Sequence, residues 1–298
     1  MTSTLIEMEI DMARNLQQEI ADRIIAAMEG GKLPWNKPWS GSVGGGMPKN
    51  AITGRAYSGA NVILLWMTAE ERGYTSPKWL TYKQAAEAGG TVRKGEKGTT
   101  VVYVSTFQKE GDDGKVASVP FLKAFTVFNV EQCDGLTIEA PAVYQNNEER
   151  DALCDAFIAT TKADIRHSGA RAFYNHAGDF IQLPAWEAFN GREGYYATAL
   201  HELVHWTGAK ARCDREFGKR FGDQAYAVEE LVAELGAAFM CAEFGYDCID
   251  QSAAYIQNWI ALLKTDPRVF TMAASKASRA VEFLRGLAVA EDEMAEAA

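Results

Sequence analysis

The clearest chemical signal in the sequence is a pair of histidines four residues apart. His201 and His205 enclose Glu202 in the segment Ala197–Gly208, which reads ATALHELVHWTG. Residues four apart in an α-helix lie on the same face, so both imidazoles can bind one metal ion. In this H-E-x-x-H pattern of zinc metallopeptidases, the glutamate is the general base that acts on a metal-bound water. The pattern therefore predicts a metal-binding helix with Glu202 as the catalytic residue.

A catalytic zinc site needs a third protein ligand and an open fourth position. The sequence EELVAE at Glu229–Glu234 lies in a helix expected over 225–243 and offers carboxylates. We expect Glu230 to be the third ligand, because Glu234 lies one turn further on and can hydrogen-bond to a ligand histidine. Glu229 is the alternative ligand. Zinc is the expected ion and manganese the alternative, because relative affinity does not decide which ion a site holds.

A strand–turn–strand segment precedes the histidine motif. Residues 172–174 and 179–183 are expected to be strands, and the sequence NHAG at 175–178 between them indicates a hairpin. A sheet edge beside a metal site can hold an extended peptide by adding it as a further strand. His167 and His176 are alternative metal ligands, but no fixed spacing ties them to the motif, so we expect them to be polar surface residues.

A basic, aromatic block lies inside an acidic chain. The net charge is −10, yet residues 30–109 hold eleven Lys and Arg against four Asp and Glu, and four of the seven tryptophans. Single-stranded nucleic acid is bound by basic grooves and by aromatic rings on which bases stack. A glycine-rich basic turn also presents backbone N–H groups to phosphate. The candidate nucleic-acid-binding residues are therefore Trp35, Lys37, Trp39, Trp79, Lys83, Arg93, Lys94 and Lys97. Core burial is an equal alternative for Trp79, whereas Trp35 and Trp39, near prolines, are expected to be exposed.

Composition indicates the cellular compartment of the protein. The five cysteines are odd in number and show no C-x-x-C spacing, which indicates free thiols in a reducing compartment. The first 29 residues are acidic and periodic, unlike a signal peptide, and no stretch approaches the roughly 20 apolar residues of a membrane span. We expect a cytoplasmic protein with no membrane association.

The order of patterns predicts an α+β fold in two domains, 1–143 and 144–298. In the first, helices are expected at 5–29, 60–72 and 81–88, with a small antiparallel sheet built from strands at 99–104 and 121–129. The polar segment 134–147 is expected to be a linker. The second domain is expected to add helices near 149–159, 253–264 and 273–287, before a disordered acidic tail at 291–298.

Over nearly its whole length the chain resembles the ArdC family of plasmid antirestriction proteins, whose N-terminal part is similar to that of TraC-type primases. The resemblance is carried by Leu33–Trp39, Trp79–Gln84 with the turn at Arg93–Gly98, Phe128–Asn129, Phe173–Pro184, His201–Gly208 and Glu229–Glu234. It implies a single-stranded DNA-binding domain at 1–143 and a zincin-like metallopeptidase domain at 144–298. It also implies protection of incoming plasmid DNA from host restriction during conjugation.

Three functional hypotheses follow. The first is an antirestriction protein that binds single-stranded DNA and carries a zinc-type metallopeptidase, with a host restriction or DNA-processing protein as its target. The second is a DNA-binding shield on a catalytically silent zincin scaffold. The third is a metallopeptidase with no nucleic-acid role, which the local basic block disfavours.

Overall fold

The computed structural model describes residues 2–35, 46–110, 116–136, 148–189, 191–217, 224–246 and 253–296. Lys37 and Trp39 lie outside these residues, as does most of the expected linker at 134–147.

The N-terminal half is a mixture of helices and short strands around one long strand pair. Its helices are α1 (Thr2–Glu29), α2 (Ala60–Arg72) and α3 (Tyr82–Glu87). Its strands are β1 (Lys49–Asn50), β2 (Lys78–Leu80), β3 (Thr91–Val92), β4 (Thr99–Glu110), β5 (Val116–Asn129) and β6 (Cys133–Asp134), with a short 3-10 turn at Val130–Gln132.

The main N-terminal sheet has the order β1-β2-β5-β4, and β4 and β5 pair antiparallel over their whole described length. The expected antiparallel sheet is thus confirmed, with both strands longer than predicted. The side chain of Thr81 accepts a hydrogen bond from the backbone N–H of Gln84, and the Gln84 side chain caps Thr81 in return. This reciprocal cap begins α3 where the sequence predicts a helix.

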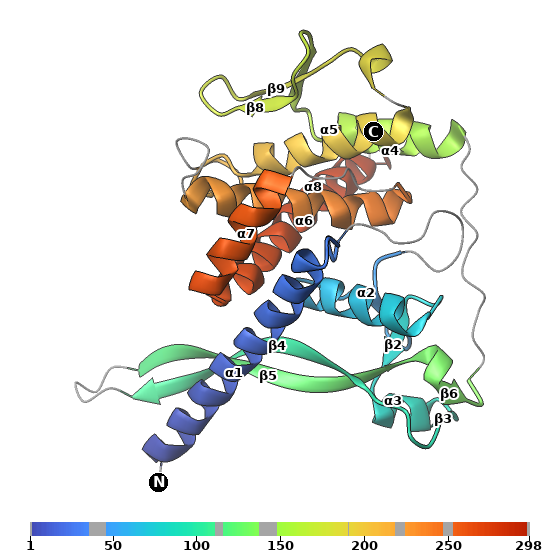
Figure 1. Cartoon of the computed structure of the whole chain (residues 1–298). Coiled ribbons are helices and arrows are strands. Elements are labelled where there is room, and N and C mark those ends of the chain that lie inside the picture. Colours follow the sequence, from blue (N-terminus) through green and yellow to red (C-terminus); the bar gives the residue numbers. More distant parts are fainter. Residues whose placement is uncertain are drawn as a thin grey trace.

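The C-terminal half is mainly helical, with a small sheet on one side. Its helices are α4 (Glu148–Thr160), α5 (Arg192–Thr207), α6 (Gln224–Phe244), α7 (Ala253–Thr265) and α8 (Arg268–Glu296). Strands β7 (Asp164–His167), β8 (Phe173–Asn175) and β9 (Phe180–Leu183) form a sheet of order β7-β9-β8, and a 3-10 turn at Trp186–Ala188 leads to α5. Figure 1 shows this sheet at one end, followed by α5 and α6, with α7 and α8 against α6, and then α1 and α2 above the N-terminal sheet.

Helices α5 and α6 pack against each other and carry the two predicted metal-binding segments. Gly236 on α6 makes this approach close, because a Cβ atom there would lie 2.8 Å from Cγ2 of Val204 on α5. The glycine thus sets the distance between the two helices, as its small size suggests. The residues on either side of this contact, from Leu231 to Ala242, are buried.

One hydrophobic core joins both halves of the chain. Ile24 and Trp35 belong to the same buried cluster as Leu203, Trp259 and Phe270. Helix α1 packs against α7 and α8, and the backbone N–H of Gly59 donates to Oγ of Ser278 at 2.7 Å. The overall α+β class is confirmed. Residues on both sides of the predicted domain boundary at 143 contribute to this shared core.

The expected disorder of the tail at 291–298 is wrong for most of its length, because α8 continues to Glu296. The segment AEDEMAE is rich in Ala, Glu and Met, which favour helix even without a packing partner. Among the described residues, no helix combines the length and apolar character that a membrane span requires.

Candidate metal centre

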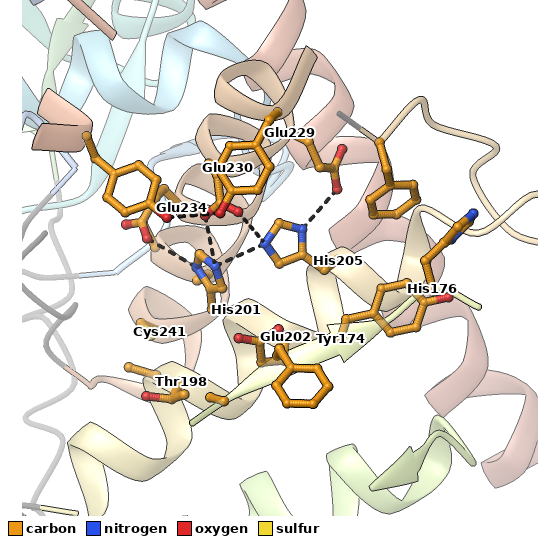
Figure 2. A pocket seen from close by; sticks show the side chains of 18 residues that line it. Tyr174, His176, Thr198, His201, Glu202, His205, Glu229, Glu230, Glu234 and Cys241 are labelled. Atoms are coloured by element: carbon orange, nitrogen blue, oxygen red, sulfur yellow. Dashed lines mark hydrogen bonds and ion pairs between the residues drawn. The ribbon is translucent and has the colours of Figure 1, made fainter. Parts of the chain in front are cut away.

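His201, His205 and Glu230 converge on one point between α5 and α6. The Nε2 atoms of the two histidines lie 3.1 Å apart. The carboxylate of Glu230 lies 3.8 Å from Nε2 of His201 and 3.6 Å from Nε2 of His205. One possible ligand atom from each of the three residues lies within 4.8 Å of the other two. Figure 2 shows the three side chains pointing toward one another from the two helices.

A carboxylate holds the other nitrogen of each imidazole. Nδ1 of His201 lies 3.1 Å from Glu234, and Nδ1 of His205 lies 3.1 Å from Glu229. A carboxylate accepts only from a protonated nitrogen, so these contacts hold each ring through Nδ1 and leave Nε2 as the nitrogen that can bind a metal. The structure therefore places Glu230 at the point of convergence, with Glu229 behind His205 and Glu234 behind His201.

Arg215 completes the support behind His205, and sequence reasoning missed it. Its guanidinium donates to Glu229 through Nε at 2.9 Å and Nη2 at 2.8 Å, and its side chain is only 3% exposed. It also donates to Oγ1 of Thr207 and to the carbonyl of Val204 at the end of α5. Gly208 admits this side chain, because a Cβ there would lie 2.9 Å from Nη2 of Arg215. Arg215 follows α5 in a loop, where no periodic pattern marks it.

The electrostatics of the site favour a divalent cation. Burial lowers the pKa of His201, but its hydrogen bond to Glu234 and the surrounding carboxylates outweigh this and raise the pKa to about 9. Burial raises the pKa of Glu229, but hydrogen bonds from His205 and Arg215 outweigh it, and the net shift is downward. The carboxylates near the two imidazoles are Glu202, Glu229, Glu230 and Glu234. Metal binding requires both imidazoles to be neutral, and in that state these four carboxylates face the single guanidinium of Arg215, an excess of negative charge that a divalent ion would compensate.

A cavity of about 470 Å³ opens beside the converging ligands. Its walls come from α5, α6, Tyr255 of α7 and the strand β8, which lies at one edge of its sheet. Glu202 lines this cavity and is 7% exposed. Figure 2 shows Glu202 and Glu230 on opposite sides of the two imidazoles, with Glu202 on the side of Tyr174 from β8. The carboxylate of Glu202 thus faces the space beside the ligands.

Two tyrosines that sequence reasoning missed also line this cavity. The hydroxyls of Tyr226 on α6 and Tyr255 on α7 lie 3.0 Å apart. Burial, the hydrogen bond to Tyr255 and the charge of Glu230 raise the pKa of Tyr226 above its ordinary value. Both phenols therefore remain protonated donors at neutral pH. Tyr226 lies four residues before Glu230, so helical spacing could have marked it.

The other two histidines lie apart from His201, His205 and Glu230. The side chain of His167 is exposed, and its Nε2 is 2.9 Å from the hydroxyl of Tyr195 on α5. His176 lines the cavity and packs against Phe217 with the rings tilted and their centroids 4.6 Å apart.

A clamp joins the β8–β9 hairpin to the end of α5. The guanidinium of Arg212 packs over the Trp206 ring, 3.9 Å from its centroid, and forms an ion pair with Asp179 in the hairpin turn. It also donates to the hydroxyl of Tyr174 at 3.2 Å. The edge strand is thereby held in position relative to α5.

The expectation that Trp35 is exposed is wrong, and Trp79 takes its alternative core role. Trp35 is 2% exposed because its ring packs edge-on against Trp259 at 5.6 Å and stacks on Phe270. Trp79 is 1% exposed in a cluster with Leu65, Ala69, Val101 and Val127. The proline-rich context of Trp35 suggested exposure, but the shared core covers it.

The basic candidates of the N-terminal half differ in their surroundings. Arg93 forms an ion pair with Glu96 at 2.8 Å and donates to the carbonyl of Glu131 at 2.6 Å, so internal partners occupy its guanidinium. Lys83, Lys94 and Lys97 are exposed. Lys83 also forms an ion pair with Glu87 at 3.5 Å. Lys94 and Lys97 are therefore the two more accessible to phosphate, whereas Arg93 holds its turn in place.

Comparison with known proteins agrees with both halves. Residues 14–128 match the family model for the N-terminal domain of anti-restriction factor ArdC, and residues 152–276 match that for a zincin-like metallopeptidase. The metal-free crystal structure of the antirestriction protein ArdC from plasmid R388 is 46% identical, with a TM-score of 0.79, and the match covers 92% of this chain and 98% of that one. The chain belongs to the ArdC antirestriction family. The family's N-terminal domain and its zincin-like domain are both present.

A second ArdC structure bears on the metal. The Mn(II)-bound crystal structure of the R388 protein is 45% identical, with a TM-score of 0.77 over 92% of this chain and 98% of that one. The two imidazoles, one carboxylate and excess negative charge of the present chain fit a divalent metal of this kind.

Curated relatives extend the family. DNA primase TraC of Escherichia coli is 36% identical over 92% of this chain, and the chain spans only 27% of that primase. A second Escherichia coli TraC is 38% identical, and the chain spans 19% of it. Protein y4eC of Sinorhizobium fredii is 35% identical over 91% of both chains. The resemblance to TraC thus concerns one part of a much longer protein.

Proposed function

We propose that this chain protects incoming plasmid DNA from host restriction during conjugation, by binding single-stranded DNA and by acting as a metal-dependent peptidase. The observation that carries the peptidase part is the position of Glu202, whose carboxylate lines the cavity beside the converging His201, His205 and Glu230. A general base in that place is what peptide hydrolysis requires.

His201, His205 and Glu230 would hold the ion, with zinc or manganese as its identity. When bound, a divalent ion supplies Lewis acidity that polarises a carbonyl and makes water more acidic. Glu202 accepts a proton from the attacking water as the new C–O bond forms. The same carboxyl then passes that proton to the amide nitrogen as the C–N bond breaks, so the base is restored for the next cycle.

The surrounding side chains suit an extended peptide. The edge strand β8 offers its unpaired backbone side to a substrate strand, and the clamp of Arg212 on Asp179 holds that edge beside the cavity. Tyr226 and Tyr255 share one hydrogen bond between their hydroxyls, and the pair can donate a further hydrogen bond to the negative charge that develops on the carbonyl oxygen. The proposed target is a host restriction or DNA-processing protein in the cytoplasm, where incoming DNA meets restriction.

The DNA-binding part rests on charge. Residues 30–109 carry eleven basic against four acidic residues, and Lys83, Lys94 and Lys97 are exposed within that block. Exposed lysines neutralise phosphates and release counterions, so the affinity for single strands is expected to fall steeply with salt.

The rival function is a DNA shield whose zincin half is only a scaffold. Glu202→Gln separates the two, because it removes the base and spares the three ligands. Glu187→Gln, an exposed carboxylate outside the cavity, is the matched control. We expect the Glu202 variant to keep its metal content and its single-strand binding but to lose plasmid protection, counted as transconjugants in a restricting host. Protection equal to that of the Glu187 variant would refute the peptidase mechanism and favour the shield.

A further inference from the structure

The strands β4 and β5 present aromatic rings to solvent on the outer part of one face. Figure 1 shows the two strands as a long ribbon that extends beyond the rest of their sheet. Tyr103 is 61% exposed and Phe125 is 43% exposed, although large aromatic side chains are usually well covered. Lys123 is also exposed, and its ammonium lies 5.5 Å from the centroid of the Phe125 ring. Tyr103, Lys123 and Phe125 are called the ribbon patch below.

The strand register places the three side chains of the ribbon patch on the same face. Tyr103 pairs directly with Lys123, and Val101 pairs directly with Phe125. Directly paired residues share a face, and residues two apart on one strand do so as well. The rings of Tyr103 and Phe125 are therefore diagonal neighbours across the ribbon, at a typical separation of about 7–8 Å between Cα atoms.

The inner part of the same face is anchored. Val101 and Val127 are 5% and 1% exposed, and they pack with Leu65 and Ala69 of α2. The side chain of Asn61 on α2 also bonds both backbone groups of Val102, at 2.7 Å each. The ribbon patch thus begins at the pair Val101–Phe125, where Val101 is buried against α2, and its backbone is held by α2.

We infer that the ribbon patch is a stacking platform for unpaired bases of single-stranded DNA. This inference rests on the proposed DNA-binding function and replaces buried Trp35 and Trp79 as the aromatic part of the DNA site. Exposed rings take the faces of unpaired bases, whatever their sequence, and the adjacent ammonium neutralises a phosphate. Two rings and one lysine match two successive nucleotides.

The chemistry of the patch favours nucleic acid over a protein partner. The cation beside the rings attracts phosphate, and Tyr103 lies within the basic block of residues 30–109. A duplex hides its base faces, so the patch is expected to distinguish single strands from duplexes.

The test is binding of the full chain to a fluorescently labelled oligothymidine, followed by anisotropy, with a duplex of equal length in parallel. Tyr103→Leu and Phe125→Leu keep an apolar side chain but remove the ring. Each is expected to weaken single-strand binding by about 5-fold to 150-fold, the range typical of one stacked base, with little effect on the duplex. Tyr103→Phe keeps the ring and is expected to bind as the unchanged protein does.

The opposite face of the same ribbon supplies the matched control. Thr100 and Thr126 pair with each other and are both exposed, so Thr100→Ala and Thr126→Ala perturb the same strands without touching the patch. Both are expected to leave binding unchanged. Lys123→Gln is expected to reduce the slope of log affinity against log salt by about 0.7.

Three outcomes would overturn the inference. If the unchanged protein binds single strands and the two leucine variants bind equally well, the patch has no stacking role, although the proposed function stands. If the unchanged protein binds no single strand at any salt concentration, the DNA part of the proposed function fails with it. If the leucine variants instead convert a dimer to a monomer in sedimentation, the patch is a contact between copies of the chain. Thermal melting of each variant checks that any loss occurs in folded protein.

Discussion

Removal of the negative charge on Glu229 is expected to lower both the stability of the protein and its affinity for metal. In Glu229→Gln the carboxylate that faces both Nδ1 of His205 and the guanidinium of Arg215 becomes a neutral amide of the same size. Arg215, with a side chain 3% exposed, then keeps its buried charge without a counter-charge from Glu229. His205 loses the charged acceptor that holds its ring.

The expected magnitudes follow from burial. Breaking a buried ion pair by neutralising one partner costs about 3–5 kcal/mol of unfolding free energy. At about 2 °C per kcal/mol for a chain of this size, the metal-free protein should melt roughly 6–10 °C lower. Loss of the hydrogen bond behind a ligand histidine should lower metal affinity about 10-fold to 100-fold.

A second glutamate on α6 that pairs with an arginine provides the control. Glu243 also pairs with an arginine, Arg285, but their side chains are 27% and 38% exposed. Glu243→Gln should therefore cost about 1 kcal/mol or less and leave metal affinity unchanged.

A double variant separates the two effects. Replacing both partners, as Arg215→Met with Glu229→Leu, removes the buried charges together and should recover much of the lost stability. It should not recover metal affinity, because Nδ1 of His205 still has no carboxylate acceptor. The assays are thermal melting in chelator and titration with Mn(II) or Zn(II). The reasoning is refuted if Glu229→Gln behaves like Glu243→Gln in both assays, or if the double variant regains full metal affinity.

Three further predictions concern other parts of the structure. Gly236→Ala should lower the unfolding free energy by about 1–3 kcal/mol in denaturant melts, because the added methyl would lie 2.8 Å from Val204, and Val204→Ala should relieve part of that cost. The pKa of His201 is raised to about 9 without metal, so its proton must leave when metal binds. The apparent metal affinity should therefore rise with pH up to about 9. Calorimetry in buffers of different ionisation enthalpy should detect the released proton. Trp35→Ala should cost about 3–5 kcal/mol of stability as a core truncation, whereas Lys94→Ala should leave stability unchanged and lower the salt slope of single-strand binding by about 0.7.

Local patterns in the sequence determined much of the fold. The spacing of His201 and His205 required a helix to bring both imidazoles to one face, and α5 is that helix. Thr81 marked the start of α3 because a cap acts within a few residues of the chain. The β-branched run at 99–104 marked β4, and the apolar run at 121–129 marked β5 as its partner, because the pairing of strands that are close in the sequence is local. The resemblance to the ArdC family was also carried by short segments of this kind.

Tertiary structure decided the features that depend on which surfaces meet. Glu229 and Glu230 are adjacent on one helix, and only the angle at which α6 packs on α5 turns Glu230 toward both Nε2 atoms and Glu229 toward Arg215. Burial of Trp35 was decided by Trp259, more than two hundred residues further along the chain. Exposure of Tyr103 arose in the same way, because α2 covers the ribbon only as far as Val101. A sequence states which side chains can bind a metal or a base, but the packing of distant segments sets which of them reach the cavity or the solvent.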